Sequence, residues 1–78
     1  MSVRDIEDAL KEKKVYFGIK QCLKHKKEIK HVFISKDARD STVDKLENAK
    51  IEFVVLKTKK DLTKLLNLNF ESEVFSIK

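Results

Sequence analysis

Helix patterns and strand patterns alternate four times along this chain, and that alternation restricts the fold more than any other feature of the sequence. Runs of β-forming residues predict strands over residues 15–17, 31–35, 51–56 and 74–77. Apolar residues at helical spacing predict a helix before each strand, over residues 3–12 and around 19–23, 43–49 and 62–66. This order implies an α/β protein: a three-layer α/β/α sandwich whose neighbouring strands run parallel and are joined by right-handed crossovers.

Short polar residues mark the expected starts of three helices. Capping pairs stand at the first, third and fourth of them: Ser2 with Asp5, Asp40 or Ser41 with Asp44, and Thr58 with Asp61. The only segment expected to form a long loop is 67–73, before the last strand.

The length of 78 residues predicts a single domain over residues 1–78, with a small core. Charged residues make up 40% of the chain, and no apolar run approaches the roughly 20 residues that a membrane helix needs. The amino-terminal segment carries both charge signs and no apolar signal-peptide core, which favours a cytoplasmic protein without a membrane partner. The single cysteine, Cys22, excludes an internal disulfide.

The net charge of +5 is concentrated in two blocks. Residues 20–30 contain five lysines against one glutamate, which gives +4, and residues 57–64 contain four lysines against one aspartate, which gives +3. Clustered lysines are typical of a surface that faces the phosphates of a nucleic acid. The alternative is a solvated helix face that serves solubility, and charge alone leaves both interpretations open.

The residues show no pattern of a catalytic site, and we expect no enzyme activity. Asp37, Asp40 and Asp44 lie close enough in sequence for a Mg²⁺ cluster, but helix capping explains the last two. Cys22 continues the apolar face of its helix, so we expect it in the core rather than as a reactive thiol. The glycine motifs that bind nucleotide phosphates do not occur in the sequence, so we expect no cofactor.

Gly18, the only glycine, stands where the first strand meets the second helix. Lys20, Gln21 and Lys24 follow in the first two turns of that helix. A helix start with free N–H groups, next to a glycine that lets another backbone approach, suits phosphates or base edges. The alternative is a plain turn glycine followed by a solvated helix, and these residues alone do not decide between the two.

Three segments carry a resemblance to a known family: residues 18–24 (GIKQCLK), 32–38 (VFISKDA) and 59–62 (KKDL). Together they resemble the L7Ae and L30e superfamily of ribosomal proteins, and in particular its short bacterial members. The resemblance spans nearly the whole chain. It implies an α/β/α sandwich with a four-stranded mixed sheet that binds kink-turn RNA, an internal loop built on sheared G·A pairs.

The resemblance implies a first set of RNA contacts at the start of the second helix. The family signature of glycine, asparagine, glutamate and a later lysine falls on Gly18, Ile19 or Lys20, Gln21 and Lys24. Lys20 and Gln21 therefore stand where asparagine and glutamate stand in the best-known branch of the family.

Two loops complete the set of contacts that the resemblance implies. The turn after the second strand contributes Lys36 and Asp37. The apolar loop before the last strand, which covers an extruded nucleotide in the family, contributes Leu68 and Phe70. For these two apolar residues the alternative is a plug of the core beneath the loop.

We therefore expect a monomeric, non-enzymatic protein that binds and stabilises a kink-turn in ribosomal or other structured RNA, with the ribosome as one setting. The alternative is an adaptor for ribosome assembly or protein interaction that uses the same fold without reading a kink-turn.

Overall fold

The computed structural model describes residues 3–78, and over that range helices and strands alternate as predicted. In chain order they are α1 (Val3–Lys11), β1 (Val15–Phe17), α2 (Ile19–Lys24), β2 (His31–Ile34), α3 (Asp40–Asn48), β3 (Val54–Val55), α4 (Lys59–Leu65) and β4 (Val74–Ile77). The predicted capping pair of the first helix includes Ser2, which lies outside the described residues. Within the described range, no helix has the length and apolarity to cross a bilayer.

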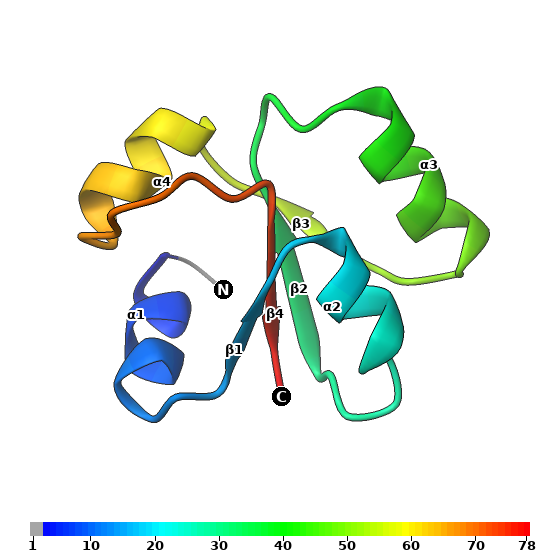
Figure 1. The fold of residues 1–78 in the computed structure, drawn as a ribbon, viewed down its shortest axis with the longest axis horizontal. Coiled ribbons are helices and arrows are strands. Elements are labelled where there is room, and N and C mark those ends of the chain that lie inside the picture. The colour runs from blue at the N-terminus through cyan, green and yellow to red at the C-terminus, as the bar shows by residue number, and fades with distance from the viewer. Residues whose placement is uncertain (1–2) are drawn as a thin grey trace.

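Helices cover both faces of the sheet, which confirms the predicted three-layer sandwich. Figure 1 shows α1 and α4 on one side of the strands and α2 and α3 on the other. The core on the α1 and α4 side contains Ile6, Ala9, Phe33, Leu62, Leu66, Phe75 and Ile77. The core on the α2 and α3 side contains Cys22, Val32, Ile34, Leu46 and Val74.

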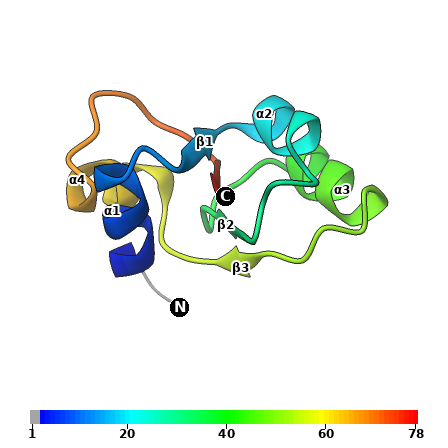
Figure 2. The ribbon, with the colours of Figure 1, turned by 90° about the horizontal axis from the view of Figure 1, so that it is seen from below.

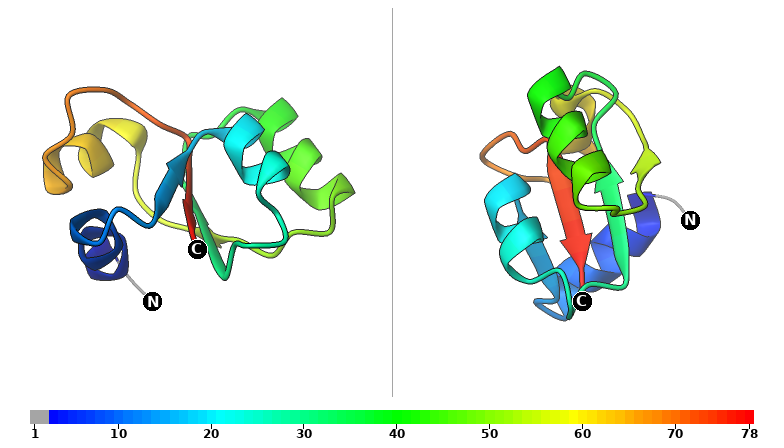
Figure 3. Two further views of the ribbon diagram at one scale, coloured as in Figure 1. Left: turned by 60° about the horizontal axis from the view of Figure 1, so that its bottom comes forward. Right: turned by 90° about the vertical axis from the view of Figure 1, so that its right-hand side faces the viewer.

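The strands lie in the order β1-β4-β2-β3, and the sheet is mixed, as the family resemblance implied. The expectation of parallel neighbours is wrong for two of the three pairs, because β4 runs antiparallel to both β1 and β2 and only β2 and β3 are parallel. The reason is the connection after α4, which returns the chain to the end of the sheet where β2 stops, and there Ser35 N–H donates to Glu73 O at 2.9 Å. Figure 2 shows β4 between β1 and β2, and Figure 3 shows its opposite direction.

The central strand β4 is buried throughout because it serves both cores. Val74 belongs to the core beside α2 and α3, whereas Phe75 belongs to the core beside α1 and α4. In the register of the sheet, Phe75 lies between Phe17 of β1 and Phe33 of β2. The rings of Phe17 and Phe75 meet edge to face, with centroids 5.8 Å apart. This row of three phenylalanines joins the strands across the α1 and α4 face.

Strand β3 is shorter than predicted, with Val54–Val55 in the ladder instead of residues 51–56. Ile51 and Phe53 pack against the core beside α2 and α3 without joining the sheet. Leu56 packs against the opposite core. The residues of this segment that pack against the cores therefore flank the strand, whereas Val54 and Val55 of the ladder are exposed.

The predicted cap of α4 is confirmed, and the predicted cap of α3 is wrong. Thr58 Oγ1 accepts a hydrogen bond from Asp61 N–H at 3.2 Å. Helix α3 begins at Asp40, so its N-cap residue is Arg39, whose side chain forms no capping hydrogen bond. The backbone N–H of Arg39 instead donates to the Glu73 carboxylate at 3.4 Å. A distant glutamate thus takes the place of a local cap, a substitution that sequence spacing does not reveal.

Candidate functional site

An open hollow of about 710 Å³ lies where α2 begins and the chain enters β4. Figure 1 shows the segment leading into β4 crossing the upper end of the sheet, between α4 on one side and α2 and α3 on the other. The hollow is lined by residues from four parts of the chain: Phe17, Gly18, Ile19, Lys20, Gln21, Arg39, Lys59, Glu71, Ser72 and Glu73.

Gly18 forms part of the wall with its bare backbone. Its dihedral angles are φ 88° and ψ 162°, a conformation that essentially only glycine adopts. Its N–H donates to Val74 O at 3.0 Å, which fixes the start of α2 against β4. A Cβ at this position would meet no other atom within 4 Å, so the space beside the glycine is open to a ligand.

Glu73 ties the surrounding elements together beneath the hollow. Its side chain is only 11% exposed. It accepts hydrogen bonds from Arg39 Nε at 2.9 Å and from Thr42 Oγ1 at 2.7 Å. The Lys59 ammonium, at the start of α4, lies 3.7 Å from the same carboxylate. One carboxylate therefore positions two cations of the hollow, which come from residues 39 and 59.

The environment of Glu73 keeps its carboxylate charged. Burial by itself would raise the pKa of Glu73, but the hydrogen bonds from Thr42 and Arg39 and the charge of Arg39 outweigh it, so the pKa lies below its usual value. The carboxylate is consequently ionised at neutral pH and remains the partner of both cations.

The sequence matches the ribosomal protein L7Ae/L30e/S12e/Gadd45 family over residues 3–78. The chain belongs to this family. The resemblance predicted from three sequence segments is thereby confirmed over nearly the whole chain.

Solved structures with the same fold include proteins with little sequence identity to this member of the L7Ae/L30e family. A 15.5 kD RNA-binding protein of Giardia lamblia has a TM-score of 0.73 and 19% identity, over 96% of this chain and 68% of that chain. A Bacillus halodurans protein of unknown function has a TM-score of 0.76 and 22% identity, over 94% of this chain and 79% of that chain. At such identities the likeness concerns the fold. The curated proteins include no match to this sequence.

The residues predicted as contacts from the L7Ae/L30e resemblance fall into two groups in the structure. Gly18, Lys20 and Gln21 line the hollow together. Lys24 is exposed further along α2, and Lys36 is exposed beyond the end of β2. These two lysines lie outside the lining of the hollow.

Asp37 caps α4 in this L7Ae-family fold. Its Oδ1 accepts a hydrogen bond from the backbone N–H of Lys59 at 3.0 Å. This bond is the main reason that the pKa of the exposed Asp37 carboxyl lies below its usual value. Together with Thr58, Asp37 fixes the first turn of α4, which carries Lys59 into the hollow.

The two predicted apolar contacts lie in different surroundings. Leu68 is half-buried and packs against the core beside α1 and α4. Phe70 is 44% exposed. Its ring meets that of Phe17, which lines the hollow, edge to face with centroids 5.0 Å apart. Phe70 therefore provides an open aromatic surface beside the hollow.

Sequence reasoning missed Arg39, Lys59 and Glu73 as a group. They are separated by 20 and 14 residues, and they come together only because the chain returns to this end of the sheet before β4. The sequence offered a signal only for Lys59, which belongs to the second lysine block and begins the third segment that carries the family resemblance.

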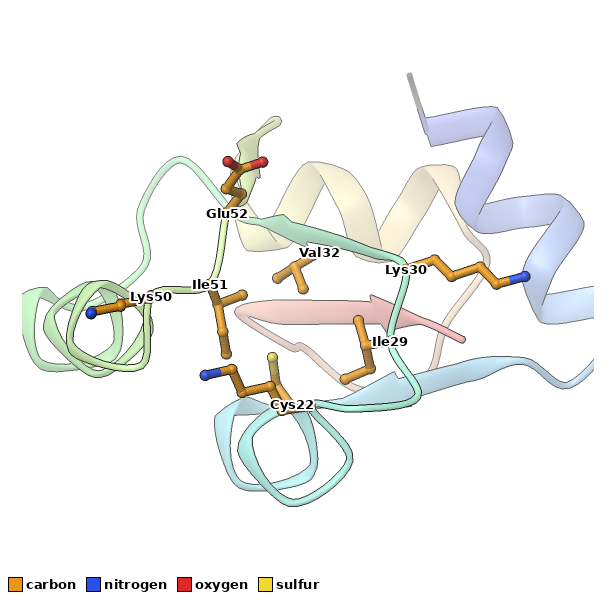
Figure 4. Close-up of a pocket in the computed structure, with 8 residues that line it drawn as sticks. Cys22, Ile29, Lys30, Val32, Lys50, Ile51 and Glu52 are labelled. Carbon is orange, nitrogen blue, oxygen red and sulfur yellow. The ribbon is translucent and has the colours of Figure 1, made fainter.

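A second, smaller hollow of about 250 Å³ lies beside Cys22 (Figure 4). Cys22 is fully buried, as predicted, and burial raises the pKa of its thiol, so it is a poor nucleophile. The ammonium groups of Lys30 and Lys50 point away from this hollow in Figure 4. In the described part of the chain, histidine, cysteine, aspartate and glutamate form no group of three that could hold a metal ion.

Proposed function

We propose that this member of the L7Ae/L30e family is a non-enzymatic protein that recognises and stabilises kink-turn RNA. The observation that carries the proposal is the meeting of Gly18, Lys20 and Gln21 with Arg39 and Lys59 in one hollow. The name of the similar Giardia lamblia protein, an RNA-binding protein, supports RNA as the partner. We further propose a monomeric cytoplasmic protein that acts on ribosomal or other structured RNA.

The charges of the hollow suit a nucleic acid with both phosphates and base edges exposed. Lys20, Arg39 and Lys59 supply three positive charges, and Glu71 and Glu73 supply two negative ones. Glu73 is already paired with Arg39 and Lys59, so its repulsion of phosphate is largely compensated. The amide of Gln21 can donate and accept, as reading a base edge requires.

The aromatic surface beside the hollow suits an unstacked base. The exposed ring of Phe70 contacts the ring of Phe17, and Phe17 lines the hollow together with Gly18 and Gln21. Proteins usually read RNA where bases are unstacked, and each stacked base contributes roughly 1–3 kcal/mol. A kinked internal loop supplies such bases, whereas a regular duplex does not.

The mechanism that we propose is selection of a bent RNA conformation. The protein shifts the equilibrium between extended and kinked RNA by the ratio of its affinities for the two forms. A preformed hollow favours this mode of action, because its walls are held by backbone bonds at Gly18 and Ser35 and by the Glu73 ion pairs.

A gel shift tests the proposal with two RNAs, a kink-turn and the same duplex without its G·A pairs. We expect the kink-turn to bind more tightly at matched salt. Equal affinity for the two RNAs would contradict kink-turn recognition and would favour the adaptor role.

Replacing Lys24 by alanine should weaken binding to every kink-turn target by a similar factor. Lys24 is exposed on α2, one turn beyond Lys20, where it would contact a phosphate. Loss of one phosphate contact should lower the slope of log K against log salt by about 0.7–0.9. Lys11→Ala, in the last turn of α1 and outside both lysine blocks, removes the same charge elsewhere and should leave the slope unchanged. An unchanged slope for Lys24→Ala would refute the phosphate contact.

Restoring the common family pair, Lys20→Asn with Gln21→Glu, should raise the preference for a kink-turn over plain duplex by about tenfold. A carboxylate accepts two hydrogen bonds from a guanine edge, whereas an amide offers one acceptor and one donor. Tenfold corresponds to about 1.4 kcal/mol of discrimination. The lost lysine and added carboxylate should weaken nonspecific binding. Titrations of both RNAs at one salt concentration measure the ratio, and a flat or falling ratio would mean that Gln21 faces no guanine.

A further inference from the structure

The side chain of Arg39 is held at one end and open at the other. Its Nε donates to Glu73 Oε1 at 2.9 Å, and its backbone N–H donates to the same oxygen at 3.4 Å. The side chain is nevertheless 72% exposed. Within residues 3–78, the structure gives the terminal nitrogens Nη1 and Nη2 no hydrogen-bond partner. A guanidinium carries five N–H donors in a planar fork, so four of them remain free at the hollow.

Glu73 is a positioning group and not a ligand contact, because its acceptors are already used. Oε1 faces Arg39 and Lys59, and Oε2 accepts from Thr42. The backbone of Glu73 is fixed as well, since its carbonyl accepts from Ser35 N–H at 2.9 Å. The carboxylate therefore cannot move away from Arg39 without losing its contacts with Thr42 of α3 and Lys59 of α4.

An arginine held in this way loses little conformational freedom when a ligand binds. Free arginine side chains lose rotamer entropy on binding, and prior fixation removes much of that cost. The planar fork also fits two neighbouring acceptors at once, which an ammonium cannot do. In RNA, such acceptor pairs are two phosphate oxygens or O6 and N7 of guanine.

We propose that Arg39 is a specificity-determining contact, whose free guanidinium edge binds a pair of acceptors on the RNA, and that Glu73 is its positioning residue. This inference rests on the proposed function and adds two residues to it. Neither residue belongs to the family signature at residues 18–24. Both line the same hollow as Gly18, Lys20 and Gln21 of that signature.

Substitutions at Arg39 test whether the fork or only the charge matters. Arg39→Gln should lower the ratio of kink-turn to duplex affinity by about tenfold. Arg39→Lys keeps the charge without the fork and should restore duplex binding but not the ratio. Arg4→Gln, at an exposed position of α1, is the matched control, since it removes the only other arginine charge and should leave the ratio unchanged. Full recovery of the ratio by Arg39→Lys would overturn the proposal.

The two sources of acceptors are separated by changing the RNA. If the acceptors belong to guanine, replacing the kink-turn guanines by 7-deazaguanine should weaken RNA binding by the wild-type protein. The same replacement should leave RNA binding by the Arg39→Gln variant unchanged. If they belong to a phosphate, 7-deazaguanine should have no effect that depends on Arg39, and Arg39→Gln should lower the salt slope by about 0.7–0.9. If 7-deazaguanine has no Arg39-dependent effect and Arg39→Gln leaves the salt slope unchanged, the proposed Arg39 contact is overturned.

Glu73→Gln separates positioning from general electrostatics, because the two predict opposite results. Removing a negative charge should strengthen plain duplex binding. If Glu73 positions the guanidinium of Arg39, Glu73→Gln should instead lower the ratio of kink-turn to duplex affinity. Adding Arg39→Gln to the Glu73→Gln protein should then lower this ratio no further. A ratio that rises, or losses that simply add, would overturn the role of Glu73. Should Glu73→Gln fail to fold, as judged by its thermal transition, the Arg39→Lys comparison still decides the contact.

The wild-type ratio, measured first, distinguishes the two proposals. A ratio of kink-turn to duplex affinity near one refutes kink-turn recognition, and it therefore also refutes the proposed role of Arg39. A ratio well above one that Arg39→Gln leaves unchanged refutes the Arg39 contact alone and leaves kink-turn recognition standing.

Discussion

Phe75→Ala is expected to remove about 3–5 kcal/mol from the free energy of unfolding. Phe75 is 1% exposed and lies on the central strand, between Phe17 and Phe33 in the register of the sheet. Truncation leaves a cavity that fixed neighbours on β1, β2, α1 and α4 cannot fill. A chain of 78 residues is stabilised by only about 4–12 kcal/mol, so this substitution should remove a large share of the total.

Denaturant unfolding followed by circular dichroism measures this effect, and Phe70→Ala is the matched control. Phe70 is 44% exposed, so the same substitution there should cost far less stability. A loss below about 1 kcal/mol for Phe75→Ala would contradict the arrangement of the central strand.

Gly18→Val is expected to destabilise the fold by about 1–3 kcal/mol and to abolish most kink-turn binding. The φ of 88° and ψ of 162° force strain on any residue with a Cβ, and most on a β-branched one. The cost should appear as a fall in Tm of roughly 4–8 °C per kcal/mol. The added methyl groups would also occupy the open wall of the hollow, where RNA is proposed to approach.

Comparison with Gly18→Ala separates these two effects. Alanine imposes backbone strain but little bulk, and its Cβ would meet no atom within 4 Å. We expect both variants to lose stability and valine to lose more RNA affinity, measured at a temperature where each is folded. Normal binding by a folded Gly18→Val protein would exclude a close approach of RNA to this backbone.

Much of the fold could be predicted because its determinants are local in sequence. Runs of β-forming residues and helical patterns mark all eight elements, and Thr58 with Asp61 correctly marks the start of α4. The direction of β4 could not be predicted from its sequence, because a run of β-forming residues is the same for a parallel and an antiparallel strand. Only the family resemblance implied a mixed sheet.

The candidate site could be predicted in part, and for a similar reason. Gly18, Lys20 and Gln21 lie close together in sequence at the start of α2, and all three line one hollow. Arg39 and Glu73 are 34 residues apart, and no spacing rule connects them. Asp37 shows the converse, because its capping bond to Lys59 is a tertiary contact that a sequence motif does not distinguish from a ligand contact.

The insertion of β4 between β1 and β2 has a consequence for hydrogen exchange and folding kinetics. Val15 pairs with Ile77, so the sheet closes across 62 residues of sequence, a non-local contact that forms slowly. The amides of Gly18 and Ser35 donate to Val74 and Glu73, at the entrance of that same strand. We expect these amides to exchange with solvent slowly, because exchange requires the first residues of β4 to leave the sheet. The same hydrogen bonds hold the central strand and the wall of the hollow, so we expect RNA to meet the hollow already assembled.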